Sequence, residues 1–143
     1  MPHLKITNGQ PEIYSIGQLR RDNPNTSFPK SPSDALLAEW GVYPYIVQGQ
    51  PPYDYLTQTL SVAPFVEVDG AWTQGWLVSN LSVEDAGNNI RSQRNNLLSQ
   101  TDWMALSDNV MSPAWADYRQ ALRDVTAQEG FPFSVAWPVK PLE

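Results

Sequence analysis

The second half of the chain has the clearest hydrophobic periodicity. Apolar residues recur three and four positions apart over two stretches, and this spacing predicts two amphipathic helices. Ser82 is placed to cap the first helix, over residues 83–100, while Ser112-Pro113 begins the second and Gly130 ends it. We expect the two helices to form an antiparallel hairpin. The apolar positions are Val83, Ala86, Ile90 and Leu97, with Leu98 beside them, in the first helix, and Trp115, Tyr118, Leu122 and Val125 in the second.

The middle of the chain alternates apolar and polar residues with a period of two, which is typical of β-strands. One strand is expected over residues 56–62, with Pro64 ending it, and a hairpin over residues 65–78. Asp69-Gly70 is the predicted two-residue turn of this hairpin, because a type I′ turn requires a positive φ at both central residues.

The first forty residues predict short elements. Leu4–Ile6 and Tyr14–Gln18 have brief strand-like alternation, and residues 22–25 form a turn. A short helix follows, capped by Ser33 and ended by Gly41.

The last residues are rich in proline, which predicts an extended tail. Phe131, Phe133, Val135 and Trp137 would then lie on one side. We expect the tail to dock over the helical hairpin and to bury Trp137.

Together these elements predict an α+β fold. A small N-terminal antiparallel β-sheet with a short helix is followed by a C-terminal α-helical hairpin and an extended proline-rich tail. The boundary is expected near Leu81, which gives an N-terminal β-rich domain over residues 1–80 and a C-terminal helical domain over residues 81–143. Each piece alone would be marginally stable, so we expect the two to pack together or on a partner.

Composition excludes several classes of function. The chain of 143 residues has a net charge of −6, no cysteine and one histidine, His3. Thiolate nucleophiles, disulfides, histidine triads and multi-histidine zinc sites are therefore excluded. No glycine-rich phosphate loop or metal-ligand spacing is present, so we expect no cofactor, no metal and no enzymatic activity. Acidity without a Lys/Arg run argues against nucleic-acid partners, and the lack of a long apolar run argues against a membrane.

The candidate partner-binding residues are two tryptophans and four arginines. Trp72 and Trp76 alternate on one predicted strand and could be core residues, a protein interface or a platform for stacking sugars. The arginines could pair with acids of the same domain, such as Asp102, Asp108 or Asp124, or form a docking face for an acidic or carbonyl-rich segment. Trp103 and Trp115 are expected in the core. The arginines are Arg91 and Arg94 on the first long helix and Arg119 and Arg123 on the second.

From residue 84 to the end, the chain resembles the phage tail assembly chaperone family. The resemblance is carried by five ordered segments, namely Arg91-x-x-Arg94-Asn95-x-Leu97-Leu98, Thr101-Asp102-Trp103, Trp115-x-x-Tyr118-Arg119-Gln120-Ala121-Leu122-Arg123-Asp124, Gly130-Phe131-Pro132 and Val135-x-Trp137-Pro138. A weaker resemblance to the regions that accompany this family covers residues 17–24 and 33–37.

The resemblance implies a non-enzymatic protein that binds a tail-fibre or tail polypeptide, in an oligomer with that partner, in the host cytoplasm during assembly. It brings no catalytic residues. Two alternatives remain open at this point: a structural virion component, such as a tail-fibre or baseplate adaptor, and a carbohydrate-binding module for host recognition.

Overall fold

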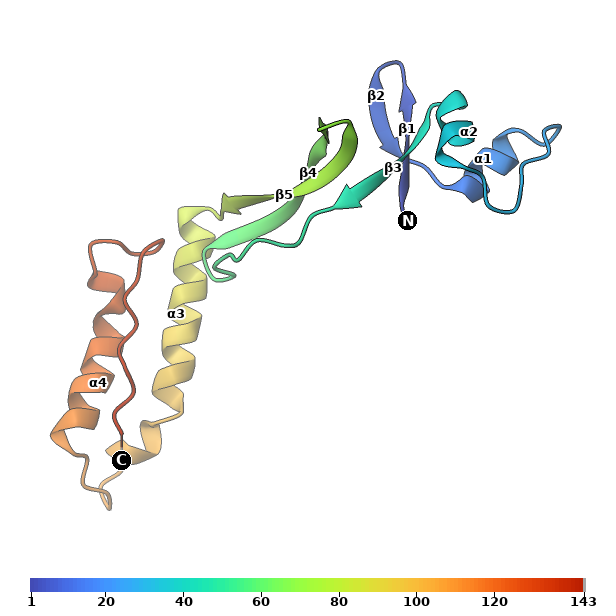
Figure 1. The fold of residues 1–143 in the computed structure, drawn as a ribbon. Coiled ribbons are helices and arrows are strands. Elements are labelled where there is room, and N and C mark those ends of the chain that lie inside the picture. Colours follow the sequence, from blue (N-terminus) through green and yellow to red (C-terminus); the bar gives the residue numbers. More distant parts are fainter. Residues whose placement is uncertain (143) are drawn as a thin grey trace. The chain divides into compact units, whose positions relative to one another are not determined.

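The computed structural model describes residues 1–142 and combines a sheet with helices (Figure 1). Two compact units are present: Met1–Pro51 with Ser61–Leu77, and Pro52–Leu60 with the chain from Val78 onward. The domain boundary expected near Leu81 stays a prediction. The elements are β1 (His3–Thr7), β2 (Gln10–Ile13), α1 (Ile16–Asp22), α2 (Asp34–Glu39), β3 (Val42–Val47), β4 (Gln58–Val68), β5 (Ala71–Asn80), α3 (Val83–Ser99), the 3-10 helix η1 (Asp102–Ala105), α4 (Pro113–Arg123) and the 3-10 helix η2 (Asp124–Ala127).

The sheet is mixed, with the strand order β2-β1-β3-β5-β4. β1 pairs antiparallel with both β2 and β3, whereas β3 pairs parallel with β5, with Tyr45 opposite Trp72. The α+β class is confirmed, but the expected purely antiparallel sheet is wrong. Hydrophobic alternation identifies strands and the hairpins between neighbours, but it carries no information on a parallel pair formed across an intervening segment.

The first helix, α1, occupies a place where alternation predicted a strand. Ser15 caps it, because the Ser15 hydroxyl accepts a hydrogen bond of 3.0 Å from the Gln18 backbone N–H. Three alternating positions are too few to specify a strand, and the Ser-x-x-Gln spacing is itself a helix-start signal. The N-terminal region therefore has two short helices rather than the one expected.

The core of the first unit gathers residues from α1, α2 and β3. Tyr14, Leu19, Leu37 and Val42 are buried together, and Phe28 packs edge-on against Trp40 with ring centroids 5.2 Å apart. The Tyr14 hydroxyl donates a 2.5 Å hydrogen bond to the Asp22 carboxylate. Burial first, and this carboxylate second, raise the pKa of Tyr14 to about 12.

The hairpin of β4 and β5 has the predicted turn. Asp69 and Gly70 have φ angles of 51° and 78°, which are the positive values that a type I′ turn requires. Pro64, however, lies inside β4 and does not end it. β4 is the last strand in the sheet order, and an edge strand tolerates a residue without a backbone N–H.

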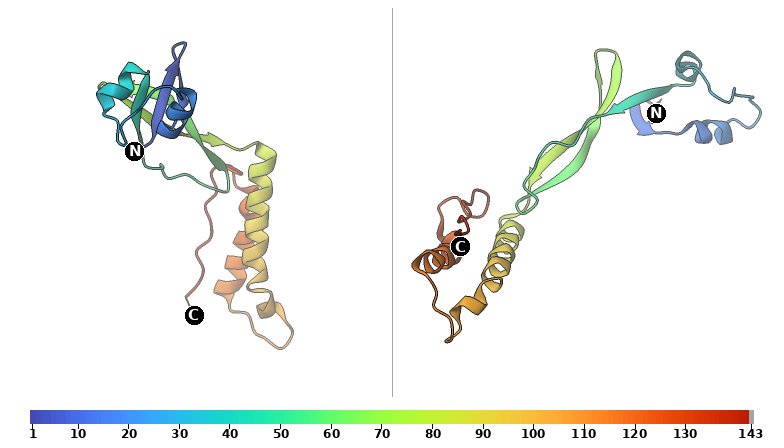
Figure 2. Two further views of the ribbon diagram at one scale, coloured as in Figure 1. Left: turned by 90° about the vertical axis from the view of Figure 1, so that its right-hand side faces the viewer. Right: turned by 60° about the horizontal axis from the view of Figure 1, so that its bottom comes forward.

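The second unit contains α3 and α4, which lie side by side (Figures 1 and 2). Ser82 and Ser112 cap these helices as predicted, each accepting a hydrogen bond from a backbone N–H of the first turn. The predicted stripes supply the buried residues Ala86, Ile90, Tyr118, Leu122 and Val125. α4 ends at Arg123 and continues as η2, so it is shorter than the sequence predicts.

The chain after η2 turns back on itself, so the prediction of an extended proline-rich tail is wrong. A Cβ at Gly130 would overlap the Ser134 carbonyl oxygen, and the Ser134 N–H donates a 2.7 Å hydrogen bond to the Gly130 carbonyl. Glycine thus permits a close turn that proline content alone does not predict. Because of this turn the expected one-sided alternation fails: Phe131 is half-buried and Phe133 is exposed.

The C-terminal segment is nevertheless attached to its own unit. The Gln128 side chain makes two 2.8 Å hydrogen bonds to the backbone of Ala136, one as donor and one as acceptor. Phe131 lies beneath the Arg91 guanidinium, 5.3 Å from its ring centroid. Trp137 is half-buried rather than fully buried.

Candidate partner-binding site

Trp72 and Trp76 both lie on β5 and are both half-buried. Trp72 is opposite Tyr45 and lines a hollow of about 230 Å³ together with Tyr43 and Pro44. Tyr45 packs edge-on against Phe65, with ring centroids 4.8 Å apart. The Trp76 indole N–H donates a 2.8 Å hydrogen bond to the Gln48 carbonyl, so this polar group is already used within the unit. A partner would therefore meet mainly the aromatic faces of these two side chains.

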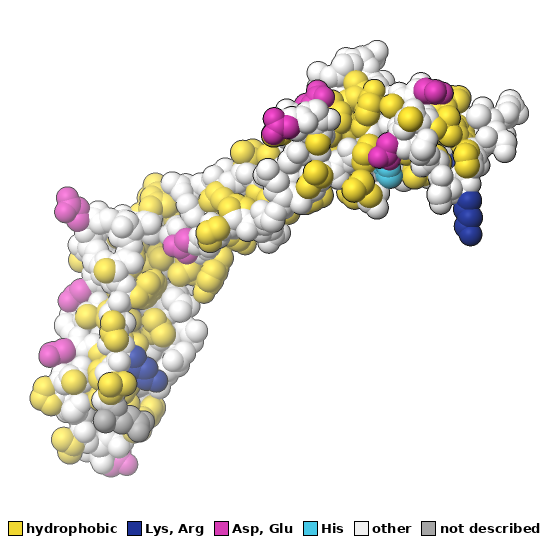
Figure 3. Space-filling model, in the orientation of Figure 1, with side chains coloured by type: hydrophobic (Ala, Val, Ile, Leu, Met, Phe, Trp, Pro, Cys, Tyr) yellow, Lys and Arg dark blue, Asp and Glu magenta, His cyan; other side chains and the backbone are white. Residues whose placement is uncertain are grey.

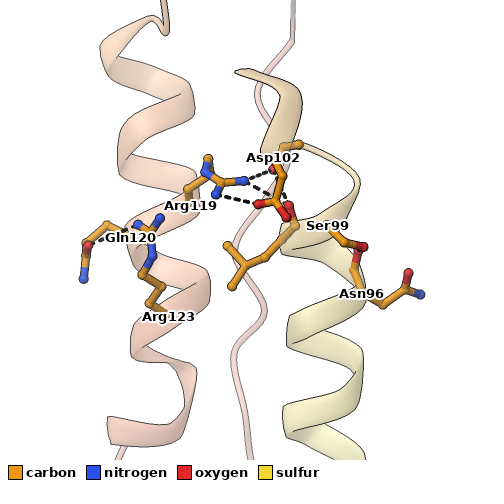
Figure 4. A network of polar contacts seen from close by, with 8 residues as sticks. Asn96, Ser99, Asp102, Arg119, Gln120 and Arg123 are labelled. Carbon is orange, nitrogen blue, oxygen red and sulfur yellow. Dashed lines mark hydrogen bonds and ion pairs between the residues drawn. The ribbon is translucent and has the colours of Figure 1, made fainter. Parts of the chain in front are cut away.

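Arg119, on α4, is buried, and its guanidinium binds three acceptors at and just beyond the C-terminal end of α3 (Figure 4). Its guanidinium donates to the Leu98 carbonyl at 2.9 Å, to the Thr101 hydroxyl at 2.6 Å and to the Asp102 carboxylate at 2.9 Å. Arg119 therefore forms an ion pair with an acid of its own unit, Asp102. Pairing with an acid of the same domain is one of the two interpretations that the sequence allows. With 6% of its surface exposed, Arg119 positions the connection that follows α3 and offers little area to a partner.

The other three arginines make separate contacts. Arg91 covers the Phe131 ring, and Arg94 donates a 3.1 Å hydrogen bond to the Asn95 side chain. Arg123 makes a long 3.4 Å hydrogen bond to Gln120 on its own helix. Among the described residues, the only ion pair is that of Arg119 with Asp102, so Arg91, Arg94 and Arg123 remain candidates for contact with a partner.

The connection between α3 and α4 forms an apolar surface that the sequence did not single out. Trp103, Met104, Val110, Met111 and Trp115 line a pocket of about 400 Å³, which we call the tip pocket. Trp103 is 55% exposed, so its expected place in the core is wrong, and Trp115 is half-buried. The sequence does contain a signal for this surface, because the loop before α4 combines apolar residues with Ser, Asp and Asn.

The reason for the exposure of Trp103 is local. α3 ends at Ser99, and the 3-10 helix η1 begins at Asp102, so Trp103 does not continue the apolar stripe of α3. The apolar spacing of α3 cannot be extended beyond Ser99, because the helical period ends with the helix. A residue placed by that spacing beyond the helix end is therefore assigned to the wrong face.

Two negative observations apply to residues 1–142. No group of three or more acidic or histidine side chains is placed to hold a metal ion. None of the helices in this range has both the length and the apolar character needed to cross a bilayer.

One comparison with known proteins gives a match. Residues 87–142 match the family model described as phage tail assembly chaperone protein, which confirms the resemblance seen in the sequence. The match covers α3 from Gly87, the connection to α4, α4 itself and the segment that follows. The comparisons with curated proteins and with solved structures find no match.

Proposed function

We propose that the chain binds a tail polypeptide during assembly, because residues 87–142 match the phage tail assembly chaperone family, which is not a family of enzymes. The observation that carries this proposal is the family match itself, which spans both long helices and their connection. The specific partner proposed is a tail-fibre polypeptide, bound in a complex that forms in the host cytoplasm.

The proposed binding residues on the sheet are Trp72 and Trp76. Their half-buried rings give a partner aromatic surface at low entropic cost, because the surrounding contacts already restrict their rotamers. An extended partner segment could also add to the free edge of β4, which is the last strand of the sheet. On the helices the proposed contacts are the three exposed or half-exposed arginines, Arg91, Arg94 and Arg123.

The test is co-expression of the tagged chain with each tail and tail-fibre protein of its phage in turn. We expect one of them to co-purify in a fixed stoichiometry. A double variant, Trp72→Ala with Arg91→Ala, should weaken this complex, whereas Val83→Ala at an exposed site of α3 should not. Failure of every tail protein to bind would contradict the proposed function.

Purified phage particles separate a chaperone from a virion component. Mass spectrometry should find the chain absent, or far below stoichiometric amounts, if it acts only during assembly. A stoichiometric amount in the particle would instead assign it a structural role in the tail.

We also propose residues 1–80 and 81–143 as the two domains of the chain. The segment 52–60 complicates this division, since the Thr57 and Leu56 carbonyls accept hydrogen bonds from the Leu81 backbone and the Asn89 side chain. Limited proteolysis tests it: a stable fragment beginning near residue 81 supports the proposed boundary, and one beginning near residue 52 contradicts it.

A further inference from the structure

The tip pocket is the strongest unassigned feature of the described residues. We propose that it binds an extended apolar segment of the tail polypeptide that carries a lysine or arginine next to its apolar anchor. This inference rests on the proposed function and adds to it the surface and the chemistry of the bound segment.

The exposure of the tip pocket and its rim is unusual for side chains of this type. Val110 is fully exposed, and Trp103 and Leu106 are 55% and 57% exposed. Isolated apolar side chains at a surface need no explanation, but a cluster around a concave pocket marks an interaction site. A volume of about 400 Å³ is large enough for one or two side chains of a partner.

The composition of the tip pocket suits peptide binding. The chain has three methionines, and the two beyond Met1 both line this pocket. Methionine is flexible and polarisable, so it adapts to different apolar partners. Trp103 and Trp115 add the large aromatic area that dominates binding energy at most protein interfaces.

The chain's own C-terminal segment places a lysine beside this surface. Lys140, Pro141 and Leu142 border a second hollow, of about 310 Å³, which shares Trp103, Met104 and Trp115 with the tip pocket. The Lys140 ammonium lies over the Trp115 ring, 5.8 Å from its centroid. Trp115, in the wall that the two hollows share, therefore already has a cation over its ring.

The charges near the tip pocket favour a basic rather than an acidic segment. Asp102 is the first residue of η1, and its side chain stays 64% exposed although one carboxylate oxygen pairs with Arg119. Exposed Asp108 directly precedes the lining residue Asn109. Figure 3 shows the acidic side chains of this unit in magenta. A lysine or arginine beside the anchor would meet the Asp108 carboxylate and the second oxygen of Asp102, and this attraction would raise the rate of association.

The pocket wall is also held in place before a partner arrives. Arg119 fixes the Leu98 carbonyl and the Thr101 hydroxyl, immediately before the η1 residues Trp103 and Met104. A wall that is already ordered loses less conformational entropy on binding.

The experiment uses the full chain labelled with ¹³C at the methionine methyl groups, which gives three resolvable signals. The probe is the tail protein identified by co-expression, followed by overlapping 15-residue peptides that cover it. We expect the Met104 and Met111 signals to shift on binding while the Met1 signal does not. The peptides that compete should contain a large apolar residue beside a lysine or arginine.

The two substitutions are made at exposed positions, so that a loss of binding does not result from unfolding of the chain. Val110→Lys should weaken binding about tenfold or more, because it replaces an apolar side chain of the pocket by a cation that repels the basic residue of the bound segment. Val83→Lys, at a 66% exposed position on the first turn of α3, is the matched control and should bind like the wild type.

The outcomes are distinct. A complex that forms without shifts at Met104 and Met111, and with unchanged affinity for Val110→Lys, overturns the inference but leaves the proposed function intact. Shifts that appear on raising the concentration of the chain alone, with a dimer in ultracentrifugation, assign the pocket to self-association and also overturn it. If no tail protein binds at all, the proposed function fails, and this inference fails with it.

Discussion

Replacing Arg119 by methionine should destabilise the helical unit substantially. The variant keeps an apolar stem of similar length but removes the donors to the Leu98 carbonyl, the Thr101 hydroxyl and the Asp102 carboxylate. The Asp102 side chain is 64% exposed, so this ion pair contributes at most about 1 kcal/mol. The Leu98 carbonyl keeps a 3.2 Å hydrogen bond from Thr101, which limits its loss. We therefore expect the free energy of unfolding to fall by about 2–3 kcal/mol.

The assay is urea unfolding followed by circular dichroism at a wavelength that reports helix, together with a thermal scan. For a chain of this size, the expected loss lowers Tm by about 5–10 °C. Arg123→Met, one turn along α4, removes only a long hydrogen bond and should change stability by less than about 0.5 kcal/mol. Asp102→Asn should cost about 1 kcal/mol or less. If Arg119→Met were no more destabilising than Arg123→Met, the buried hydrogen bonds of Arg119 would not stabilise the helical unit.

Three further predictions concern the fold. Gly130→Ala should lower stability by about 1–3 kcal/mol, because its Cβ would overlap a carbonyl oxygen four residues on, whereas Gly49→Ala, which meets nothing within 4 Å, should be neutral in the same urea titration. Tyr14 should titrate with a pKa of about 12 in an ultraviolet titration, and Tyr14→Phe should remove this late step. The folded chain favours the neutral phenol of Tyr14. The stabilisation that Tyr14 gives the folded state is therefore complete below about pH 10 and is lost between about pH 10 and pH 12. Ser82→Ala should cost about 1 kcal/mol by removing the cap of α3, and Ser92→Ala within the same helix should not.

The parts of the fold that the sequence predicted are those decided by neighbouring residues. The caps at Ser33, Ser82 and Ser112 are as predicted, because a serine hydroxyl three residues before a free N–H is a local relation. The Asp69-Gly70 turn is predicted for the same reason, since its backbone angles depend on two residues.

The parts that failed depend on contacts between distant residues. The parallel pairing of β3 with β5 joins segments that local alternation cannot relate to each other. The turn after Gly130 depends on the approach of Ser134, and an extended path inferred from proline content misses it.

The candidate site was predictable only in part. The tryptophans of β5 were found as an alternating pair, but their half-burial depends on Gln48 and Tyr45 from other segments. The four arginines looked alike in sequence, whereas the structure separates buried Arg119 from the rest. The tip pocket was missed because its residues come from a 3-10 helix, a loop and the first turn of α4, which share no common period.

The central claim is that this chain acts on a tail polypeptide during assembly. The most direct measurement is the soluble, correctly sedimenting fraction of the partner tail protein when it is expressed at a matched level with the chain, without it, or with the Val110→Lys variant. The account predicts a high soluble fraction with the wild-type chain, a low one without it, and an intermediate or low one with the variant. A soluble fraction that is the same with and without the chain would contradict the account.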